Sequence, residues 1–204
     1  MKAFQEGEDV HAYTASLVFG VPLKEVSQEM RYKAKAVNFG ILYGQQAFGL
    51  SKGLGISVKE AAQFIETYFQ RYKKVREFFD FCKESVRNLG YALTLTGRRR
   101  PIPEIDSVNP NVRAAAERLA INTPLQGTAA DLIKLAMCEL DMWLCAHGSS
   151  GSLLLQIHDE LLCEAPKDQL DACASQMKRI MEGVLSLRVP LKVDVSIGKN
   201  WGEC

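Results

Sequence analysis

The amino-acid sequence predicts an α+β protein, with a helical layer in the first half and helices packed on a small antiparallel sheet in the second. Two observations lead to this fold class. Segments rich in helix formers, separated by Gly and Pro, fill most of the first half. Two short apolar runs joined by a tight polar turn follow position 150. Because no internal repeat or low-complexity segment is present, we expect ordinary layers around a core.

The first half contains five expected helical segments with start and stop signals. They are Val10–Phe19, a short stretch from Pro22 toward Glu29, Met30–Tyr43, Ser57–Phe69 and Arg71–Leu89. Asp9 can cap the first segment, Ser57 with Glu60 forms a capping box, and Gly90 ends the last segment. The glycines between the third and fourth segments, Gly49, Gly53 and Gly55, predict a turn-rich connector.

The second half mixes strands and helices. Tyr91–Thr96 alternates as a strand, and Gly97 leads into an arginine cluster. Prolines then predict a loop, after which Asn109 can cap a helix that has Pro110 in its first position. The remaining expected elements are a long helical region Asn111–Cys145, kinked or restarted at Pro124, strands Leu153–Ile157 and Leu161–Glu164, a helix Asp168–Leu185 and a final strand Leu191–Ile197.

The composition of the chain excludes several classes of protein. The chain has 204 residues, of which 47% are hydrophobic and 24% are charged, as in globular proteins. Its formal net charge of +1 excludes a histone-like role, so a polyanion site must come from local clustering of cations. The apolar runs are shorter than the roughly 18–20 residues of a membrane span, and no signal-peptide core is present. The scattered cysteines and histidines predict reduced thiols without a zinc knuckle or disulfide framework.

A first group of candidate site residues recurs every four positions on one expected helix: Arg31, Lys35, Phe39 and Tyr43. This spacing places them along one helical face. Two cations followed by two aromatic rings suit a nucleoside triphosphate, because the cations neutralise phosphate oxygens and the rings stack on a base. The same spacing also fits a solvated cation pair beside two core aromatics.

A second group, His158, Asp159 and Glu160, forms the turn between the two apolar strands. Carboxylates at such a turn can hold Mg²⁺, a hard cation that prefers oxygen ligands, and two-metal nucleotidyl transfer uses carboxylates in this way. Polar residues at a hairpin turn are also the structural norm.

A third group combines Arg118, Asn122 and Gln126, again four residues apart, with the cluster Arg98–Arg100. Arg, Asn and Gln can donate to the acceptors that every base pair presents in the minor groove. Adjacent arginines can bind backbone phosphates without reading sequence. The arginines would equally suit a solvated turn, and the amides could form hydrogen bonds within their helix.

Together these groups resemble the DNA polymerase I family, family A of the template-directed DNA polymerases, in its C-terminal fingers-and-palm portion. The stretch RYKAKAVNFGILYG, from Arg31, is similar to the fingers motif B, and LQIHDELLCEAP, from Leu155, is similar to the palm motif C. TLTGRRRPIP resembles the template-contacting segment, ERLAINTPLQGTAAD the palm helix along the minor groove, and IGKNW the family C-terminus. The resemblance implies fingers over residues 1–108, with a nucleotide-binding helix 30–44, and the C-terminal part of the palm over residues 109–204, with a catalytic hairpin 153–164.

The resemblance also implies roles for the nucleotide-facing residues. Arg31 and Lys35 are expected to bind the incoming triphosphate, and Lys35 to donate a proton to the departing pyrophosphate. Phe39 is expected to stack beside the sugar and base; in this family a Phe there favours deoxynucleotides that bear a 3′-hydroxyl. Tyr43 is expected to hold the templating site, and His11 to lie near the β-phosphate.

For DNA and metal, the resemblance implies three sets. Asp159 and Glu160 are expected to be catalytic residues that bind Mg²⁺, with two ions in the complete polymerase. The residues expected along the primer-template minor groove are Arg118, Asn122, Gln126 and His158, and those expected on the template are Arg98, Arg99 and Arg100. The implied partners are primer-template DNA and deoxynucleoside triphosphates, with no membrane. The implied location is the cytoplasm, bacterial-type and nucleoid-associated, or an organelle, and not outside the cell.

The chain departs from the family at motif A, the strand whose Asp supplies the other bridging metal ligand, which is expected just N-terminal to Phe4. Asp159 and Glu160 alone do not provide carboxylates from both strands for two Mg²⁺ ions. We therefore expect a C-terminal fragment of weak or no activity that needs the missing N-terminal portion in cis or in trans. The alternatives are a non-catalytic remnant that binds primer-template or nucleotide, and half of a split polymerase. The glycines near position 50 lack the Gly-Lys-Ser/Thr ending of a P-loop.

Overall fold

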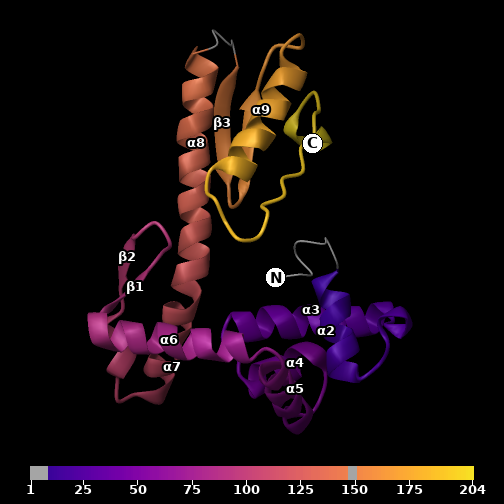
Figure 1. Ribbon diagram of the computed structural model, residues 1–204, viewed down its shortest axis with the longest axis vertical. Coiled ribbons are helices and arrows are strands. Elements are labelled where there is room, and N and C mark those ends of the chain that lie inside the picture. The colour runs from indigo at the N-terminus through magenta and orange to yellow at the C-terminus, as the bar shows by residue number, and fades with distance from the viewer. Residues whose placement is uncertain (1–8, 147–150) are drawn as a thin grey trace. The chain divides into compact units, whose positions relative to one another are not determined.

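The computed structural model describes residues 9–146 and 151–204 (Figure 1). These residues divide into two compact units on either side of the Leu125–Gln126 bond. We call them the first unit, up to Leu125, and the second unit, Gln126–Cys204, and describe each by itself. The division lies further along the chain than the boundary after residue 108 that the sequence predicts between fingers and palm, and the names fingers and palm remain predictions.

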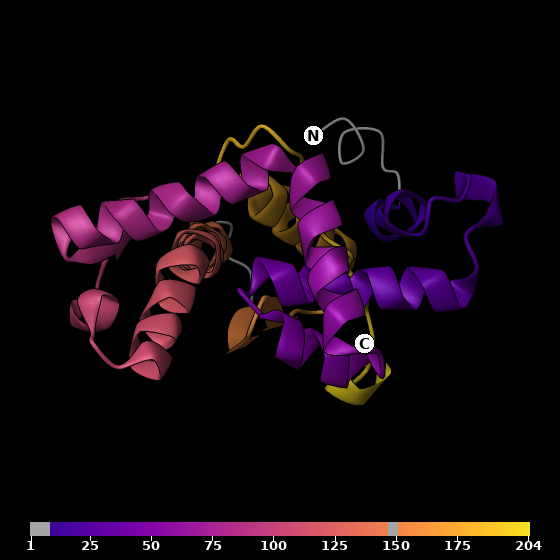
Figure 2. The same cartoon turned by 90° about the horizontal axis from the view of Figure 1, so that it is seen from below.

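The first unit is mostly helical (Figures 1 and 2). Its α-helices are α2 Val10–Phe19, α3 Gln28–Leu42, α4 Ala47–Leu54, α5 Val58–Arg71, α6 Lys73–Leu89 and α7 Pro110–Asn122, with 3₁₀ turns at Leu23–Glu25 and Pro103–Asp106. The expected caps are confirmed: Asp9 accepts from two N–H groups at the start of α2, and Ser57 with Glu60 forms the capping box of α5. Gly90 ends α6 with a φ of 79°, in the left-handed region.

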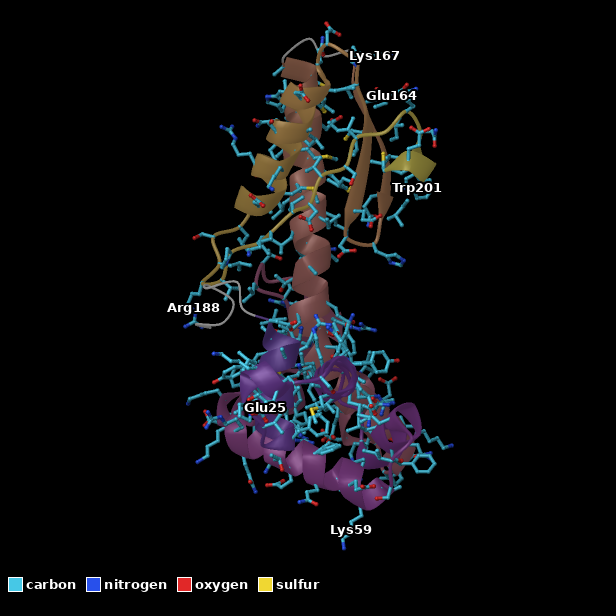
Figure 3. The ribbon with its side chains drawn as sticks, turned by 90° about the vertical axis from the view of Figure 1, so that its right-hand side faces the viewer. Glu25, Lys59, Glu164, Lys167, Arg188 and Trp201 are labelled. Atoms are coloured by element: carbon cyan, nitrogen blue, oxygen red, sulfur yellow. The ribbon has the colours of Figure 1, made fainter. Side chains whose placement is uncertain are left out.

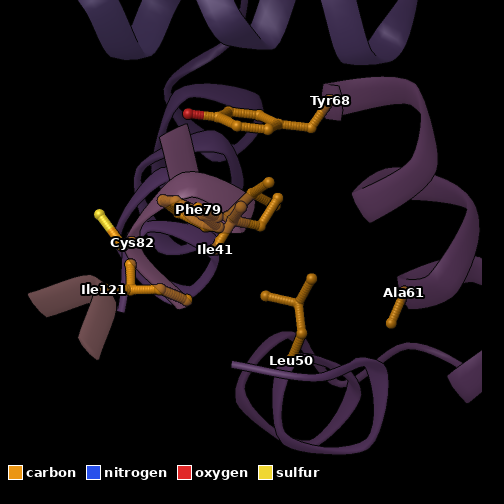
Figure 4. Packing of buried hydrophobic residues seen from close by; sticks show 8 residues of the cluster. Ile41, Leu50, Ala61, Tyr68, Phe79, Cys82 and Ile121 are labelled. Atoms are coloured by element: carbon orange, nitrogen blue, oxygen red, sulfur yellow. The ribbon is translucent and has the colours of Figure 1, made fainter. Parts of the chain in front are cut away.

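One core joins most of these helices. Val37 and Ile41 of α3 pack with Leu50, Ala61, Tyr68, Phe79, Cys82 and Ile121. Figure 4 shows side chains from α3, α4, α5, α6 and α7 gathered in this core. The core thereby fixes α3 by its buried face and leaves the opposite face of α3 for other contacts.

A small hairpin completes the first unit. Strands β1 Tyr91–Leu93 and β2 Arg99–Pro101 pair antiparallel, with Ala92 opposite Arg100. Ala92 packs in a second core with residues of α6 and α7. The strand expected at Tyr91–Thr96 is therefore shorter in the structure, and part of the arginine cluster forms its partner.

The second unit packs two helices with an antiparallel hairpin. A π-helical turn at Thr123–Gly127 spans the boundary between the units, and α8 Thr128–Ala146 follows it, so the expected restart near Pro124 is confirmed. The antiparallel hairpin β3 Ser152–Ile157 and β4 Glu160–Glu164 packs with α8 and with α9 Leu170–Gly183. Figure 3 labels Glu164 at the end of β4 and Trp201 in the terminal 3₁₀ turn Trp201–Glu203. The α+β class is confirmed.

Two expected elements are wrong. The connector around Gly49 and Gly53 is helix α4, because Leu50 is 2% exposed in the core and this packing outweighs the poor helix propensity of glycine. The final strand Leu191–Ile197 is irregular. In the described residues it pairs with no strand, and the backbone N–H of Val193 donates to Glu182 Oε1 instead (3.0 Å).

Candidate nucleotide and nucleic-acid site

The row that the sequence predicts to bind a nucleotide, Arg31, Lys35, Phe39 and Tyr43, runs along the outer face of α3. Ala34, Val37 and Ile41 bury the inner face, whereas Phe39 and Tyr43 are 43% and 48% exposed. The two rings stack with centroids 6.1 Å apart at 21°, and the ammonium group of Lys35 lies 6.0 Å from the Phe39 centroid. The alternative that these aromatics are core residues is therefore wrong, and α3 offers cations next to aromatic faces that are open for stacking.

His11 of α2 joins this row. Its ring lies 5.6 Å from that of Phe39, and its Nδ1 is 3.0 Å from the side-chain nitrogen of Asn38, which is 5% exposed. An amide nitrogen can only donate, so Nδ1 accepts and the neutral ring carries its proton on Nε2. Burial lowers the pKa of His11, the charges of Arg31 and Lys35 lower it further, and Asp9 opposes them. His11 thus presents an N–H donor beside the row.

Arg31, the first cation of the row, forms an ion pair with Asp9. Arg31 Nε lies 2.5 Å from Asp9 Oδ2, while Asp9 Oδ1 accepts from the backbone N–H groups of His11 and Ala12. The hydrogen bond from Arg31, followed by the one from Ala12, holds the pKa of the Asp9 carboxyl below its ordinary value. One carboxylate therefore links the N-terminus of α2 to the side of α3.

The end of α3 meets the helix that carries the expected minor-groove residues. Gly44 has a φ of 72°, and a Cβ atom added there would lie 2.9 Å from Cγ of Arg118 on α7. Glycine at this position therefore lets Arg118 lie close to the backbone after Tyr43. Asn122 is one turn further along α7, on the same face as Arg118.

Gln126 belongs to the π-helical turn and to the second unit. Arg118 and Asn122, four residues apart in an α-helix, therefore share a face, but this face does not continue to Gln126, because the turn that contains Gln126 is π-helical. Contact with the minor groove remains a prediction for Arg118, Asn122, Gln126 and His158.

The arginine cluster is exposed and only partly aligned. Arg99 and Arg100 are successive residues of β2, so their side chains point to opposite faces of the hairpin. The Arg99 guanidinium lies 4.9 Å from the centroid of Tyr91, and Arg98 pairs with Thr94 through its backbone. The three arginines thus present positive charge on more than one side of a short hairpin.

The acidic tip of the second unit is a two-residue turn. Ile157 pairs with Glu160, which places His158 and Asp159 at the turn itself. His158 adopts a φ of 53°, and its carbonyl oxygen accepts from the side-chain amide of Gln156 (2.6 Å). Asp159 and Glu160 are both exposed and line a cavity of about 530 Å³ that β4, α9 and the C-terminal segment enclose.

Carboxylate oxygens at this tip fit Mg²⁺ by their chemistry. Asp159 and Glu160 are adjacent in the chain and supply part of a coordination shell. Within residues 9–146 and 151–204, no group of three or more His, Cys, Asp or Glu side chains comes together as a metal site. The tip is therefore a partial donor set that further oxygen ligands would have to complete.

Asp9 and Asn38 are candidate site residues that the sequence did not indicate as such. Asp9 was expected only as a helix cap. Asn38 carries a detectable signal, since a polar amide on the buried face of an expected helix needs a hydrogen-bond partner. The identity of that partner comes from tertiary structure, because His11 lies 27 residues earlier in the chain.

In the described part of the chain, no helix is long and apolar enough to cross a membrane.

Comparisons with known proteins agree on one family. The sequence profile of DNA polymerase family A matches residues 1–203. DNA polymerase I of Caldicellulosiruptor bescii is 47% identical over 203 residues, which cover 100% of this chain and 24% of that protein. The thermostable DNA polymerase I of Thermus aquaticus is 50% identical over 201 residues, 98% of this chain and 24% of that protein. This chain therefore spans about a quarter of the length of these relatives.

A solved structure is similar over nearly the whole chain. It is the POL domain of Pol1 from M. smegmatis in complex with DNA primer-template and dNTP, with 42% sequence identity and a TM-score of 0.92. The match covers 99% of this chain and 36% of that one. From the profile, the relatives and the fold together, this chain belongs to DNA polymerase family A.

Proposed function

We propose that this chain takes part in template-directed DNA synthesis, in which the 3′-hydroxyl of a primer attacks the α-phosphate of a deoxynucleoside triphosphate. The observation that carries the proposal is the outer face of α3, where Arg31, Lys35, Phe39 and Tyr43 form one row beside the N–H donor of His11. Family membership and the similar Pol1 domain, whose complex holds DNA primer-template and dNTP, support it.

In this proposal the row binds the nucleotide from its phosphates to its base. Arg31, Lys35 and the Nε2–H of His11 bind the triphosphate, because guanidinium, ammonium and imidazole N–H groups donate to phosphate oxygens. Phe39 stacks beside the sugar and base, and Tyr43 holds the templating site. When the primer oxygen bonds to the α-phosphorus, the bond to pyrophosphate breaks and Lys35 supplies a proton to that leaving group.

Asp159 and Glu160 are proposed to hold Mg²⁺, two ions in the complete polymerase. Magnesium supplies charge neutralisation at the phosphates and at the attacking oxygen. Since these two carboxylates make only a partial donor set, we propose that efficient transfer needs further carboxylates from another polymerase segment, provided in cis or in trans.

The remaining site residues are proposed to hold the primer-template. Arg118, Asn122, Gln126 and His158 donate to the minor groove, where acceptors recur at every base pair. Arg98, Arg99 and Arg100 bind template phosphates, so this contact is sensitive to salt. By these roles, residues 1–108 form fingers and residues 109–204 the C-terminal part of a palm.

Primer extension tests the proposal. We expect little or no extension by the 204-residue chain with Mg²⁺ and deoxynucleotides, and extension once the chain is joined to the part of the C. bescii enzyme that it does not cover. Asp159→Ala in the joined protein should abolish turnover while primer-template binding persists. Asp168→Ala, which removes an exposed acid of the same unit outside the hairpin, is the matched control. A folded joined protein without activity would contradict the assignment.

A second candidate function is binding of nucleotide or primer-template without transfer. It is favoured by the partial donor set at the hairpin tip in the described residues. The expected result is salt-dependent duplex binding by the chain that Asp159→Ala leaves unchanged, with no extension even when the uncovered part of a relative is joined to the chain or mixed with it.

A further inference from the structure

The ion pair between Asp9 and Arg31 differs from an ordinary surface pair because one partner is already immobilised. Exposed pairs gain little, since two flexible side chains must be ordered to form them. Asp9 Oδ1, however, accepts from the N–H groups of His11 and Ala12 at 3.0 Å each, which fixes the carboxylate on the N-terminus of α2. Only the Arg31 side chain remains to be ordered when Oδ2 takes its Nε–H.

Asp9 binds Arg31 through Nε alone, which leaves the two terminal nitrogens of the guanidinium available for a phosphate. A guanidinium has five N–H donors in a rigid plane, and Nε carries one of them. Asp9 takes the Nε–H, and in the described residues no hydrogen bond joins the terminal nitrogens of Arg31 to protein. Those two nitrogens can bind a phosphate in a bidentate manner.

We propose that Asp9 is a positioning residue for nucleotide binding: its carboxylate, held by the start of α2, fixes the guanidinium plane of Arg31 so that the terminal nitrogens face the triphosphate. The inference rests on the proposed function, in which Arg31 binds that triphosphate. The group that Arg31 would recognise is the phosphate tail, so Asp9 should affect the affinity for deoxynucleoside triphosphates but not for monophosphates.

Asp9 also brings a negative charge near the triphosphate, and this repulsion would lower the affinity that positioning raises. The two N–H groups that donate to Asp9 and the positive end of the α2 dipole offset much of that charge. Ordering a free arginine side chain costs rotamer entropy, part of which each binding event would otherwise incur. We therefore expect positioning to outweigh repulsion.

Binding of dATP and dAMP to the 204-residue chain, measured by titration calorimetry, tests the inference. Asp9→Asn retains a good helix cap and removes the carboxylate charge. It should weaken dATP binding about two- to fivefold, as for loss of an exposed ion pair, and leave dAMP binding unchanged. The matched control is Glu29→Gln, which removes the same charge from an ion pair with Lys33 on the same helix α3 and should change neither affinity.

The double variant shows whether Asp9 acts on nucleotide binding through Arg31 or independently of it. In the Arg31→Ala background, Asp9→Asn should have no further effect on dATP affinity, since the residue acts through Arg31. An increase in dATP affinity in Asp9→Asn, an equal loss in both backgrounds, or no change while Arg31→Ala weakens binding would each overturn the positioning role. If Arg31→Ala itself leaves dATP affinity unchanged, the proposed nucleotide site fails instead. Circular dichroism of each variant checks that α2 and α3 stay folded.

Discussion

At the scale of single residues, His11 combines a partly buried ring with a defined tautomer. Its pKa lies below the ordinary value of 6.5, chiefly because burial disfavours the charged ring. Between the lowered pKa and 6.5 the unfolded chain therefore binds more protons than the folded one, so the unfolding free energy rises with pH through this window and levels off above it.

We therefore expect acidification from about pH 7.5 to about pH 5.5 to destabilise the chain in part through His11. His11→Gln keeps a side-chain oxygen that can accept from Asn38 and does not titrate. The drop in unfolding free energy between these pH values should be smaller in this variant, as measured by urea denaturation. Equal drops in both proteins would mean that His11 is not a protonation site of lowered pKa.

Gly44 is a second residue whose geometry leads to a prediction. Gly44→Ala should cost about 1–2 kcal/mol of stability because φ is 72°, and its Cβ should also displace the side chain of Arg118. Gly55→Ala has a similar φ of 65° with open space around the Cβ, so it should show the backbone cost alone. Denaturation should give similar losses for both, while salt-dependent duplex binding should weaken only in Gly44→Ala. Equal duplex binding by the two variants would contradict the proposed role of Arg118 in binding DNA.

At the scale of elements, the predictions that succeeded rest on local signals. The cap at Asp9, the capping box at Ser57 and the stop at Gly90 each act within one helical turn, so the sequence alone places α2, α5 and α6. The spacing of Arg31, Lys35, Phe39 and Tyr43 likewise places them on one face of α3. Helix geometry therefore accounts for the part of the candidate site that the sequence could predict.

The failures depend on distant parts of the chain. Helix α4 forms although it contains two glycines, because Leu50 packs on α3 and α5. The segment Leu191–Ile197 alternates like a strand, but strand pairing needs a partner, and none is present among the described residues. Arg31 with Asp9 and His11 with Asn38 are 22 and 27 residues apart, so spacing cannot reveal these pairs.

Helix α4 provides a direct test of this correction. Gly53 is exposed within the helix, and a Cβ added there meets no atom within 4 Å. Gly53→Ala should therefore raise the unfolding free energy by up to about 1 kcal/mol, the difference in helix propensity between the two residues. Chemical denaturation measures it. A loss of stability would indicate that this segment is the turn-rich connector that the sequence suggested.

At the scale of the whole molecule, the division into two units has a counterpart in the cores. Two clusters of buried residues belong to the first unit, and a third, around Leu140 of α8 and Ile180 of α9, belongs to the second. Both tryptophans of the chain, Trp143 and Trp201, lie in the second unit, whereas most helices lie in the first. Tryptophan fluorescence and far-ultraviolet circular dichroism therefore weight the two units differently.

A core substitution in the second unit should separate these two signals. Leu140 is fully buried, so Leu140→Ala should cost about 2–5 kcal/mol through lost contacts and the cavity left behind. If the units are stabilised by their own cores, thermal unfolding followed by fluorescence should shift to lower temperature by more than unfolding followed by circular dichroism. Val37→Ala, in the core of the first unit, should produce the reverse order. Coincident shifts in both variants would show that the 204 residues unfold as one cooperative body, because a two-state transition is the same by every probe.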